Sequence, residues 1–171
     1  MDDTAAQNTF ASGIRIGLGY DVHAFADGRK LVLGGVVIPH VRGLDGHSDA
    51  DVLAHAVADA LLGAVRAGDI GKLFPDTDPA YRNADSLKLL ACVAGLVRDE
   101  GFEIIDVDTV IAAQSPKLSP YRDEMRENLA RAMGVPSLSV GLKATTTEHL
   151  GFEGREEGIS AQAVCLLARC C

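Results

Sequence analysis

Tryptophan is absent from the 171 residues, and the chain holds only four cysteines and six prolines. Cys92, Cys165, Cys170 and Cys171 form no C-x-x-C pair, and the last two are adjacent. This pattern suits neither a disulfide framework nor a zinc knuckle. The cysteines are therefore predicted to be reduced thiols, as is usual for a cytoplasmic protein.

Long apolar runs and an excess of basic residues are also lacking. The longest apolar stretch, 31–39, is far shorter than the roughly 20 residues that span a bilayer. Sixteen Lys and Arg against 24 Asp and Glu give a net charge of −8, which disfavours nucleic acid and anionic membranes as partners. A phosphorylated small molecule stays open as a ligand if a metal ion and a few basic groups reverse the charge locally.

Residues 1–13 are small and polar, and they resemble neither a secretory nor an organellar signal. We predict that they form a disordered lead-in. Residues 14–171 have the length of one compact unit, so we predict a single catalytic domain there.

The sequence has neither a GxGxxG fingerprint nor a GxxxxGK[ST] loop, so a dinucleotide-binding fold or a P-loop is not supported. Hydrophobic periodicity instead alternates between strand and helix patterns. Strands are predicted at 14–23, 104–113, 138–144 and 159–167, a Gly-Gly hairpin at 30–39, and helices at 48–67, from 83 or 85 to 100, and at 120–133. This order indicates an α/β or α+β class with a mixed sheet and helices packed on one side. The last strand is so apolar that we expect it to be buried on both faces or against another subunit.

Two of the five histidines lie where a glycine-rich loop leads into a helix. Ser48 and Asp51 have the spacing of a capping box, which predicts a helix from Ser48 with His47 before it and His55 two turns inside. Asp51 and Asp59 are each four residues from His55, and we predict that they hydrogen-bond its ring.

A second segment supplies further metal-ligand chemistry. Asp21 and His23 are two apart on a predicted strand, so their side chains point the same way. With His55 they give two imidazoles and one carboxylate, the ligand set of a catalytic zinc site with its fourth position open. The spacing alone is also compatible with a turn-forming Asp21, a surface His23 and a structural His55.

Three loops carry further candidate groups. The loop 68–79 is rich in Gly, Pro and Asp and is long enough to close over a ligand. Lys117 stands in a turn after a strand, where it can meet an anion. Residues 145–148 place three threonines and a glutamate at a strand end, which suits phosphate oxygens and a hard cation such as Mg²⁺. A polar capping turn would have the same composition.

Taken in order, these segments closely resemble the 2-C-methyl-D-erythritol 2,4-cyclodiphosphate synthase family of non-mevalonate isoprenoid biosynthesis. The resemblance runs from Arg15 to about Ala168, on the motifs RIGLGYDVH, GGVVIP, GHSDADVLAH, GDIGKLFPDTDP, the PKL turn, KATTTEHLGF and GREEGI. It implies a metal-assisted intramolecular phosphoryl transfer that releases CMP. It also implies a cytoplasmic homotrimer whose active sites lie between subunits, with the metal face and the cytidine face from different chains.

The resemblance also implies roles for individual residues. It places Zn²⁺ at Asp21, His23 and His55, a second cation, Mg²⁺ or Mn²⁺, at Glu148, and transition-state groups at His47 and Thr146. The implied substrate contacts are Asp21, His23, His47, Ser48, Asp69, Ile70, Gly71, Phe74, Pro75, Asp76, Thr77, Asp78, Ala113, Gln114, Ser115, Pro116, Lys117, Leu118, Ser119, Thr145, Thr146, Thr147, Glu148, Phe152 and Arg155. Two other activities stay open: a zinc hydrolase that activates water, and a module that only stores metal or binds a small ligand.

Overall fold

The computed structural model describes residues 13–75, 77–78, 81 and 83–170. Its strands are β1 (Ile14–Ala26), β2 (Leu31–Leu33), β3 (Val36–Ile38), β4 (Gly43–Leu44), β5 (Phe102–Ala112), β6 (Val140–Thr145) and β7 (Gly158–Arg169). Its helices are α1 (Val52–Val65), α2 (Ile70–Leu73), α3 (Ser86–Asp99), α4 (Arg122–Met133) and α5 (Gly151–Gly154), with 3-10 turns at Ser119–Tyr121 and Ser137–Ser139. The predicted lead-in, apart from Gly13, lies outside the described residues, as does Cys171.

Five strands form one mixed sheet in the order β4-β1-β7-β5-β6. The long strands β1 and β7 run antiparallel over most of their length, from the pair Ile14 and Ala168 to the pair Ala24 and Gly158. β5 is antiparallel to β7 and parallel to β6. The prediction of a mixed sheet is therefore confirmed.

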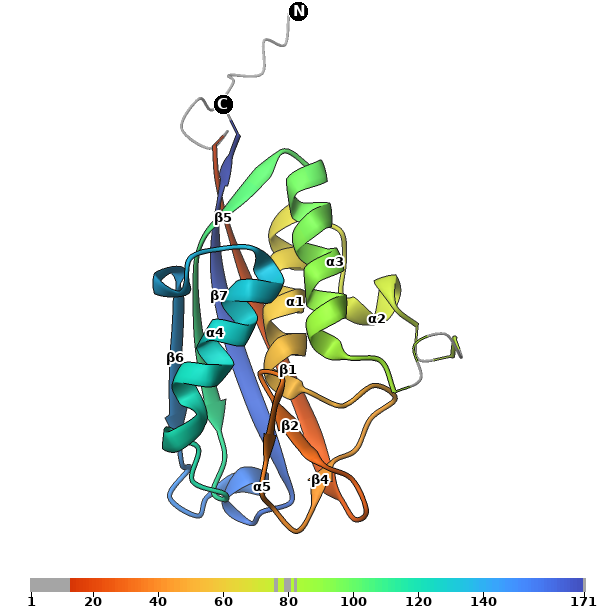
Figure 1. Ribbon diagram of the computed structural model, residues 1–171, viewed down its shortest axis with the longest axis vertical. Coiled ribbons are helices and arrows are strands. Elements are labelled where there is room, and N and C mark those ends of the chain that lie inside the picture. The colour runs from red at the N-terminus through yellow and green to blue at the C-terminus, as the bar shows by residue number, and fades with distance from the viewer. Residues whose placement is uncertain (1–12, 76, 79–80, 82, 171) are drawn as a thin grey trace, which may run out of the picture.

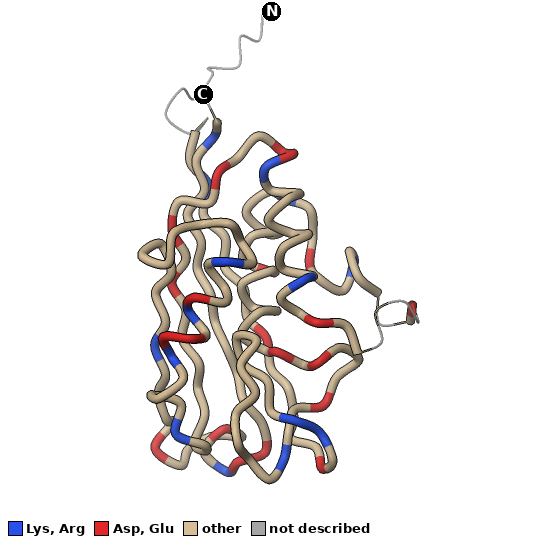
Figure 2. The backbone as a smooth tube through the Cα atoms, viewed as in Figure 1, with Lys and Arg blue, Asp and Glu red and all other residues tan. Residues whose placement is uncertain are grey.

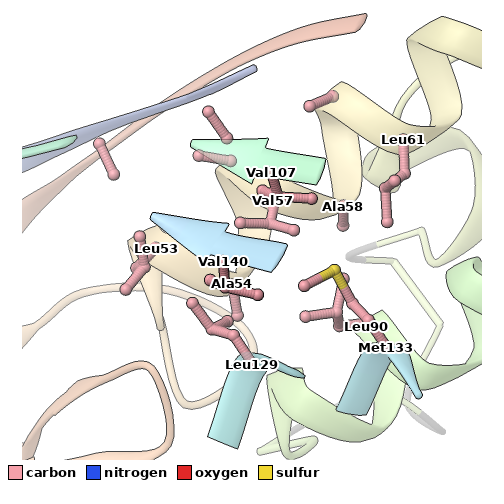
Figure 3. Packing of buried hydrophobic residues seen from close by; sticks show 14 of the residues in the cluster. Leu53, Ala54, Val57, Ala58, Leu61, Leu90, Val107, Leu129, Met133 and Val140 are labelled. Carbon is pink, nitrogen blue, oxygen red and sulfur yellow. The ribbon is translucent and has the colours of Figure 1, made fainter. Parts of the chain in front are cut away.

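Helices α1, α3 and α4 cover one face of this sheet (Figure 1). α1 lies directly on β1 and β7, with α3 against its other side. Most of its residues are buried, including Ala54, Ala58 and Leu62, because the helix is covered by the sheet and by other helices. Figure 3 shows Leu53, Val57 and Leu61 of α1 among residues from β5, β6, α3 and α4.

The opposite face of the sheet carries apolar side chains without helices over it. Along β7, Gln162 and Val164 are exposed and alternate with the buried Ala161, Ala163 and Cys165. The expectation that this strand is buried on both faces within one chain is therefore wrong, since the described residues form a layer on the helix-covered face alone. The alternative, burial against another subunit, is compatible with the exposed face.

Turn and capping residues in the sequence predict several element boundaries correctly. The hairpin forms as predicted, with β2 paired antiparallel to β3 around Gly34 and Gly35, both at positive φ. Asp85 caps α3, its side chain accepting from the N–H of Leu87, and Gly134 ends α4 in the left-handed conformation. At these positions the residue type itself favours a turn or a helix end, so the sequence alone predicts the structure.

Charged residues are spread over the fold. Figure 2 shows acidic and basic positions mixed along the described chain rather than gathered in one segment. Among the described helices, none combines the length and the apolar character needed to cross a bilayer. Over the described residues, the acidic excess is thus distributed along the chain.

Candidate active site

Strand β1 carries two of the three predicted metal ligands. Asp21 and His23 are partly buried and lie on the same side of the strand as Gly17 and Gly19, the side that faces α1. Val22 between them is 43% exposed on the bare face. The prediction that the two side chains project together is confirmed, because alternate residues of a strand share a face.

The two glycines of β1 bring α1 close enough to complete the site. A Cβ atom on Gly17 would lie 1.8 Å from the carbonyl oxygen of Ala60, and one on Gly19 would lie 1.9 Å from that of Ala56. No side chain fits there, so the strand backbone packs directly on the helix backbone. This contact places His55, one residue before Ala56, beside Asp21 and His23.

The start of α1 differs from the sequence-based prediction. The helix begins at Val52, not Ser48, and Asp51 is its N-cap, accepting from the N–H of Ala54 at 3.1 Å. Asp51 is fully buried and also accepts from the N–H groups of Gly34 and Gly35, at 2.9 and 2.7 Å. Its carboxylate thus ties the hairpin to the helix, an interaction between distant segments that local spacing does not reveal. His55 consequently lies in the first turn of α1 and not two turns inside.

Neither predicted partner of His55 contacts its ring. Asp51 is occupied by the N–H groups just described, and the carboxylate of Asp59 accepts from the N–H of Ile70 at 2.7 Å. The Nε2 atom of His55 lies instead 2.9 Å from the Oγ of Ser86 and 3.2 Å from the Oγ of Ser48. The prediction is wrong because backbone N–H groups take both carboxylates: those of the hairpin and the first turn of α1 hold Asp51, and that of Ile70 holds Asp59.

The three predicted ligands converge on one point. Asp21 Oδ2 lies 3.1 Å from His23 Nε2 and 3.0 Å from His55 Nδ1, and the two nitrogens are 3.2 Å apart. Ligand atoms around a tetrahedral zinc ion, with bonds of about 2.0 to 2.2 Å, are separated by roughly 3.3 Å or slightly more. The donor set and its spacing therefore fit one divalent cation.

The second nitrogen of His23 is held by the backbone. Its Nδ1 lies 2.5 Å from the carbonyl oxygen of Asp45. A carbonyl only accepts, so Nδ1 carries the proton and the lone pair of Nε2 faces Asp21 and His55. The ring is thus oriented for metal binding by a contact outside the ligand set.

Electrostatics in this cluster favours a bound cation. Burial alone would raise the pKa of Asp21, but hydrogen bonds with His23 and His55 outweigh it, so its pKa lies well below the ordinary 3.8. Burial would lower the pKa of His23, but its hydrogen bond with Asp21 and the charge of that carboxylate raise it above 6.5. Asp21 is therefore ionised throughout the neutral range, and protons compete for His23 as the pH falls.

A cavity of about 430 Å³ opens in front of this cluster. We call it the histidine pocket; its lining is Asp21, His23, Gly46, His47, Ser48, His55, Ile70, Gly71, Phe74, Tyr81 and Leu89. Tyr81 and Leu89 were missed by sequence reasoning, although the ring of Tyr81 packs edge-on against Phe74, at 5.2 Å between ring centroids. An aromatic pair seven residues apart in an irregular loop has no periodic signal that would reveal it.

Other predicted contacts surround this pocket without being part of its lining. Asp69 caps α2, its side chain accepting from the N–H of Lys72 at 2.8 Å. The Nε2 atom of His47 lies 3.3 Å from the backbone oxygen of Asp78. Pro75 and Thr77 follow α2 in the same segment, and Asp76 lies outside the described residues.

A second cavity, of about 370 Å³, lies where β5 and β6 end. We call it the Lys117 pocket; its lining is Ala113, Gln114, Pro116, Lys117, Leu118, Ser119, Arg122, Ala144, Thr145 and Thr146. The pairing of Ala112 with Thr145 in parallel strands brings the two loops together. Arg122, at the start of α4, was missed, because a charged residue in the first turn of a helix has many ordinary surface roles.

The lining of the Lys117 pocket does not include the other predicted residues, which are Ser115, Thr147, Glu148, Phe152 and Arg155. Glu148 accepts from the hydroxyl of Thr146 at 2.7 Å and has a positive φ of 51°. Arg155 forms a two-point ion pair with Glu157, at 2.9 and 3.0 Å. Among the described residues, the histidine pocket and the Lys117 pocket share no lining residue, so the predicted residues that line them fall into two separate groups.

Comparison with known proteins groups the chain with enzymes. The YgbB family model matches residues 14–168. The 2-C-methyl-D-erythritol 2,4-cyclodiphosphate synthase of Geobacillus thermodenitrificans is 59% identical over 155 residues, which are 91% of this chain and 97% of that protein.

Solved structures agree with this grouping. A structure of 2C-methyl-D-erythritol-2,4-cyclodiphosphate synthase in a CDP-bound form is 40% identical, with a TM-score of 0.82, and covers 90% of this chain and 99% of its own. The CDP complex of IspF from Plasmodium falciparum is 33% identical, with a TM-score of 0.81, and covers 93% and 98%. Both solved structures are described as complexes with the same nucleotide.

Proposed function

The chain belongs to the YgbB family, and we propose that it converts 4-diphosphocytidyl-2-C-methyl-D-erythritol 2-phosphate to 2-C-methyl-D-erythritol 2,4-cyclodiphosphate and CMP. The observation that carries this proposal is the pair of pockets: one holds a complete ligand set for a divalent cation, and the other has the basic and hydroxyl groups that suit a nucleotide diphosphate. A relative with 59% identity bears the name of this synthase.

The reaction is an internal phosphoryl transfer. An oxygen of the 2-phosphate attacks the β-phosphorus of the same molecule, and the bond from that phosphorus to the oxygen of the α-phosphate breaks. CMP leaves with the bonding electron pair, and the ring of the cyclic diphosphate closes. The attacking phosphate is already an anion, so the protein needs no strong general base; it must fold the substrate and neutralise crowded oxygens.

Asp21, His23 and His55 would hold the zinc ion, and Glu148 a second cation, Mg²⁺ or Mn²⁺, together with the substrate diphosphate. Bound there, the cations supply Lewis-acid stabilisation of the negative charge on the diphosphate oxygens. His47 lines the cavity in front of the ligand cluster, and Thr146 lines the other cavity and donates to Glu148. We assign both to stabilising the transition state: the ring of His47 would donate to a phosphate oxygen, and the Thr146 hydroxyl would do so once Glu148 holds the cation and no longer accepts its proton.

The two pockets suit different parts of the substrate. The histidine pocket combines Ile70, Gly71 and Phe74 with the ligand cluster, a lining that suits the methylerythritol phosphate. The Lys117 pocket offers a lysine, an arginine and hydroxyl groups, which suit the cytidine diphosphate. Ser115, Thr147, Phe152 and Arg155 are assigned to the edge of this second pocket, and the segment from Pro75 to Asp78 to the edge of the first.

The enzyme is proposed to act as a cytoplasmic homotrimer in which the histidine pocket of one chain faces the Lys117 pocket of a neighbour. The bare face of the sheet supports this assembly, because monomers rarely expose such a surface. Its large apolar side chains, all at least 43% exposed, are Ile14, Ile16, Leu18, Tyr20 and Val22 of β1, Ile105 of β5 and Val164 of β7. Burial of this face between three chains would remove it from water and set the pockets between subunits.

Incubation of the zinc- and magnesium-loaded protein with the diphosphocytidyl substrate tests the proposal. Phosphorus NMR should show CMP and a cyclic diphosphate formed in equal amounts. CMP together with a linear diphosphate would indicate a hydrolase instead. Retention of the intact substrate, with both metals present, would indicate a binding module.

A further inference from the structure

A chain of hydrogen bonds runs behind the metal ligand His55, on the side away from Asp21 and His23. The Oγ of Ser86 lies 2.9 Å from His55 Nε2 and 2.5 Å from Oδ1 of Asp49. Ser86 is 1% exposed and is the first residue of α3, whereas His55 lies in α1. The contact therefore joins two helices through the back of the proposed metal site.

The direction of these hydrogen bonds follows from the chemistry of their groups. A carboxylate only accepts, so the single hydroxyl proton of Ser86 points at Asp49. The lone pairs of the same oxygen are then available to His55, and they accept a proton carried by Nε2. A neutral imidazole with its proton on Nε2 has a free lone pair on Nδ1, the atom that faces Asp21 and His23.

Ser48 is the only other hydroxyl that the described structure places on this nitrogen. Its Oγ lies farther away, at 3.2 Å, and it already accepts from the N–H of Ala50 at 3.1 Å. Among the described residues, the Oγ of Ser48 contacts no carboxylate that would fix the direction of its proton, and it lies 3.3 Å from the Oγ of Ser86. Ser86, held by Asp49, therefore determines the tautomer.

Asp49 is itself held in place by the backbone. Its Oδ2 accepts from the N–H of Ser86 at 3.2 Å, and its Oδ1 accepts from the N–H of Asp51 at 3.3 Å. The N–H of Asp49 in turn donates to the carbonyl of Ala84 at 3.0 Å. Both carboxylate oxygens thus face donors, an arrangement that an amide side chain cannot reproduce.

From this geometry we infer that Asp49 and Ser86 are positioning residues for the metal: they fix the proton of His55 on Nε2 and present its Nδ1 lone pair to the cation. With the proton of His23 held by the Asp45 carbonyl, three acceptor atoms then face one another. Only a cation or a shared proton satisfies such a set. The inference rests on the proposed function, since it concerns the same metal site.

The test measures zinc affinity by chelator competition on the full-length protein. Groups that orient a metal-bound histidine typically contribute about 10- to 100-fold in affinity, and we expect a loss of about this size for Ser86→Ala and for Asp49→Asn. In Asp49→Asn the amide group must meet one of the facing N–H groups, so its hydrogen bond to Ser86 is disturbed. Ser160→Ala is the matched control, because Ser160 is also buried and donates to a carboxylate, that of Glu153 at 2.7 Å.

A second measurement, on the zinc-loaded protein, detects the hydrogen bond between His55 Nε2 and Ser86 directly. Proton NMR should show the Nε2 proton of His55 exchanging slowly in the wild type and at least about tenfold faster in Ser86→Ala, since a hydrogen bond protects it. The Nδ1 proton of His23, held by Asp45, is the internal reference and should not change. This comparison within one spectrum separates loss of the contact from general unfolding.

The outcomes distinguish this inference from the proposed function. Zinc affinity and Nε2 exchange that are unchanged in both variants would overturn the role of Asp49 and Ser86, even if the wild type forms the cyclic product. A wild type that binds zinc through this hydrogen-bond chain but forms no cyclic product would refute the proposed function and leave the inference standing.

Discussion

The two pockets of this chain are built in different ways. The ligand cluster of the histidine pocket is held by contacts between segments far apart in sequence: Asp21 meets His55, and His23 meets the carbonyl of Asp45. The threonines beside the Lys117 pocket contact near neighbours, Thr146 with Glu148 and Thr145 with the Thr146 carbonyl. One long-range contact is present, since Gln114 accepts from the N–H of His149 at 3.2 Å. One pocket is thus preorganised by the fold, whereas the other presents exposed groups that substrate, cation and a neighbouring chain would complete.

Loss of one ligand from the preorganised pocket should have the largest effect. His55→Ala removes one of three protein donors, so stoichiometric zinc and synthase activity should both be lost while the protein stays folded, because the ring lies at the edge of a cavity. Metal analysis and circular dichroism measure this. His40→Ala is the control, since that ring packs on Phe25 instead. Full zinc retention in the His55 variant would count against the ligand assignment.

The close contact of β1 with α1 should be the next most sensitive feature. Gly19→Ala places a methyl group where the Ala56 carbonyl lies, so we expect destabilisation of about 3 kcal/mol or more, together with weaker zinc binding. Denaturant unfolding and chelator competition measure the two effects.

Gly95→Ala is the control for Gly19→Ala, and its expected change in stability has the opposite sign. A Cβ at Gly95, inside α3, meets nothing within 4 Å, so the substitution should stabilise the protein by about 0.5 to 1 kcal/mol. Equal stability changes in the two variants would show that the strand and helix are not in forced contact.

A change beside the Lys117 pocket should leave zinc unaffected. Glu148→Gln removes the negative charge proposed to hold the second cation, so the Mg²⁺ concentration for half-maximal rate should rise about tenfold, with bound zinc unchanged. A rate titration with Mg²⁺, alongside metal analysis, gives both quantities. Superimposable titrations for wild type and variant would refute this role for Glu148.

The smallest effect is expected for a single basic group. Lys117→Ala removes one positive charge from a pocket that also contains Arg122, so KM should rise roughly three- to tenfold with kcat nearly unchanged. Lys88→Ala, at a lysine side chain that is 83% exposed on α3, should leave both constants as they are. A KM that stays the same in the Lys117 variant would remove this residue from the substrate site.

The same contrast explains how far the sequence predicts the structure. Three features follow from interactions between residues close in sequence. Strand alternation predicts that Asp21 and His23 share a side of β1. The glycine pair predicts the turn at Gly34 and Gly35, and helix capping predicts the cap at Asp85. The start of α1 cannot be predicted in this way, because Asp51, its N-cap, is held by hydrogen bonds from hairpin N–H groups 16 and 17 residues away.

The residues that contact the ring of His55 also cannot be predicted from residues close to it in sequence. Ser86 lies 31 residues from His55, and its hydroxyl has no sequence pattern that marks it as a partner. The metal ligands can thus be proposed from residue types and spacing, whereas the groups that orient them depend on how α1 and α3 pack. Tertiary contacts supply that information, and a single sequence does not.

Mixed assemblies test most directly the central claim that one pocket from each of two chains forms the active site. His55→Ala damages only the histidine pocket and Thr146→Ala only the Lys117 pocket, so each variant alone should be inactive. In trimers assembled from equal amounts of both, with mixing verified by native mass spectrometry, about a quarter of the interfaces join two intact pockets, and about a quarter of the wild-type rate should return. Mixed trimers as inactive as either parent would contradict the claim.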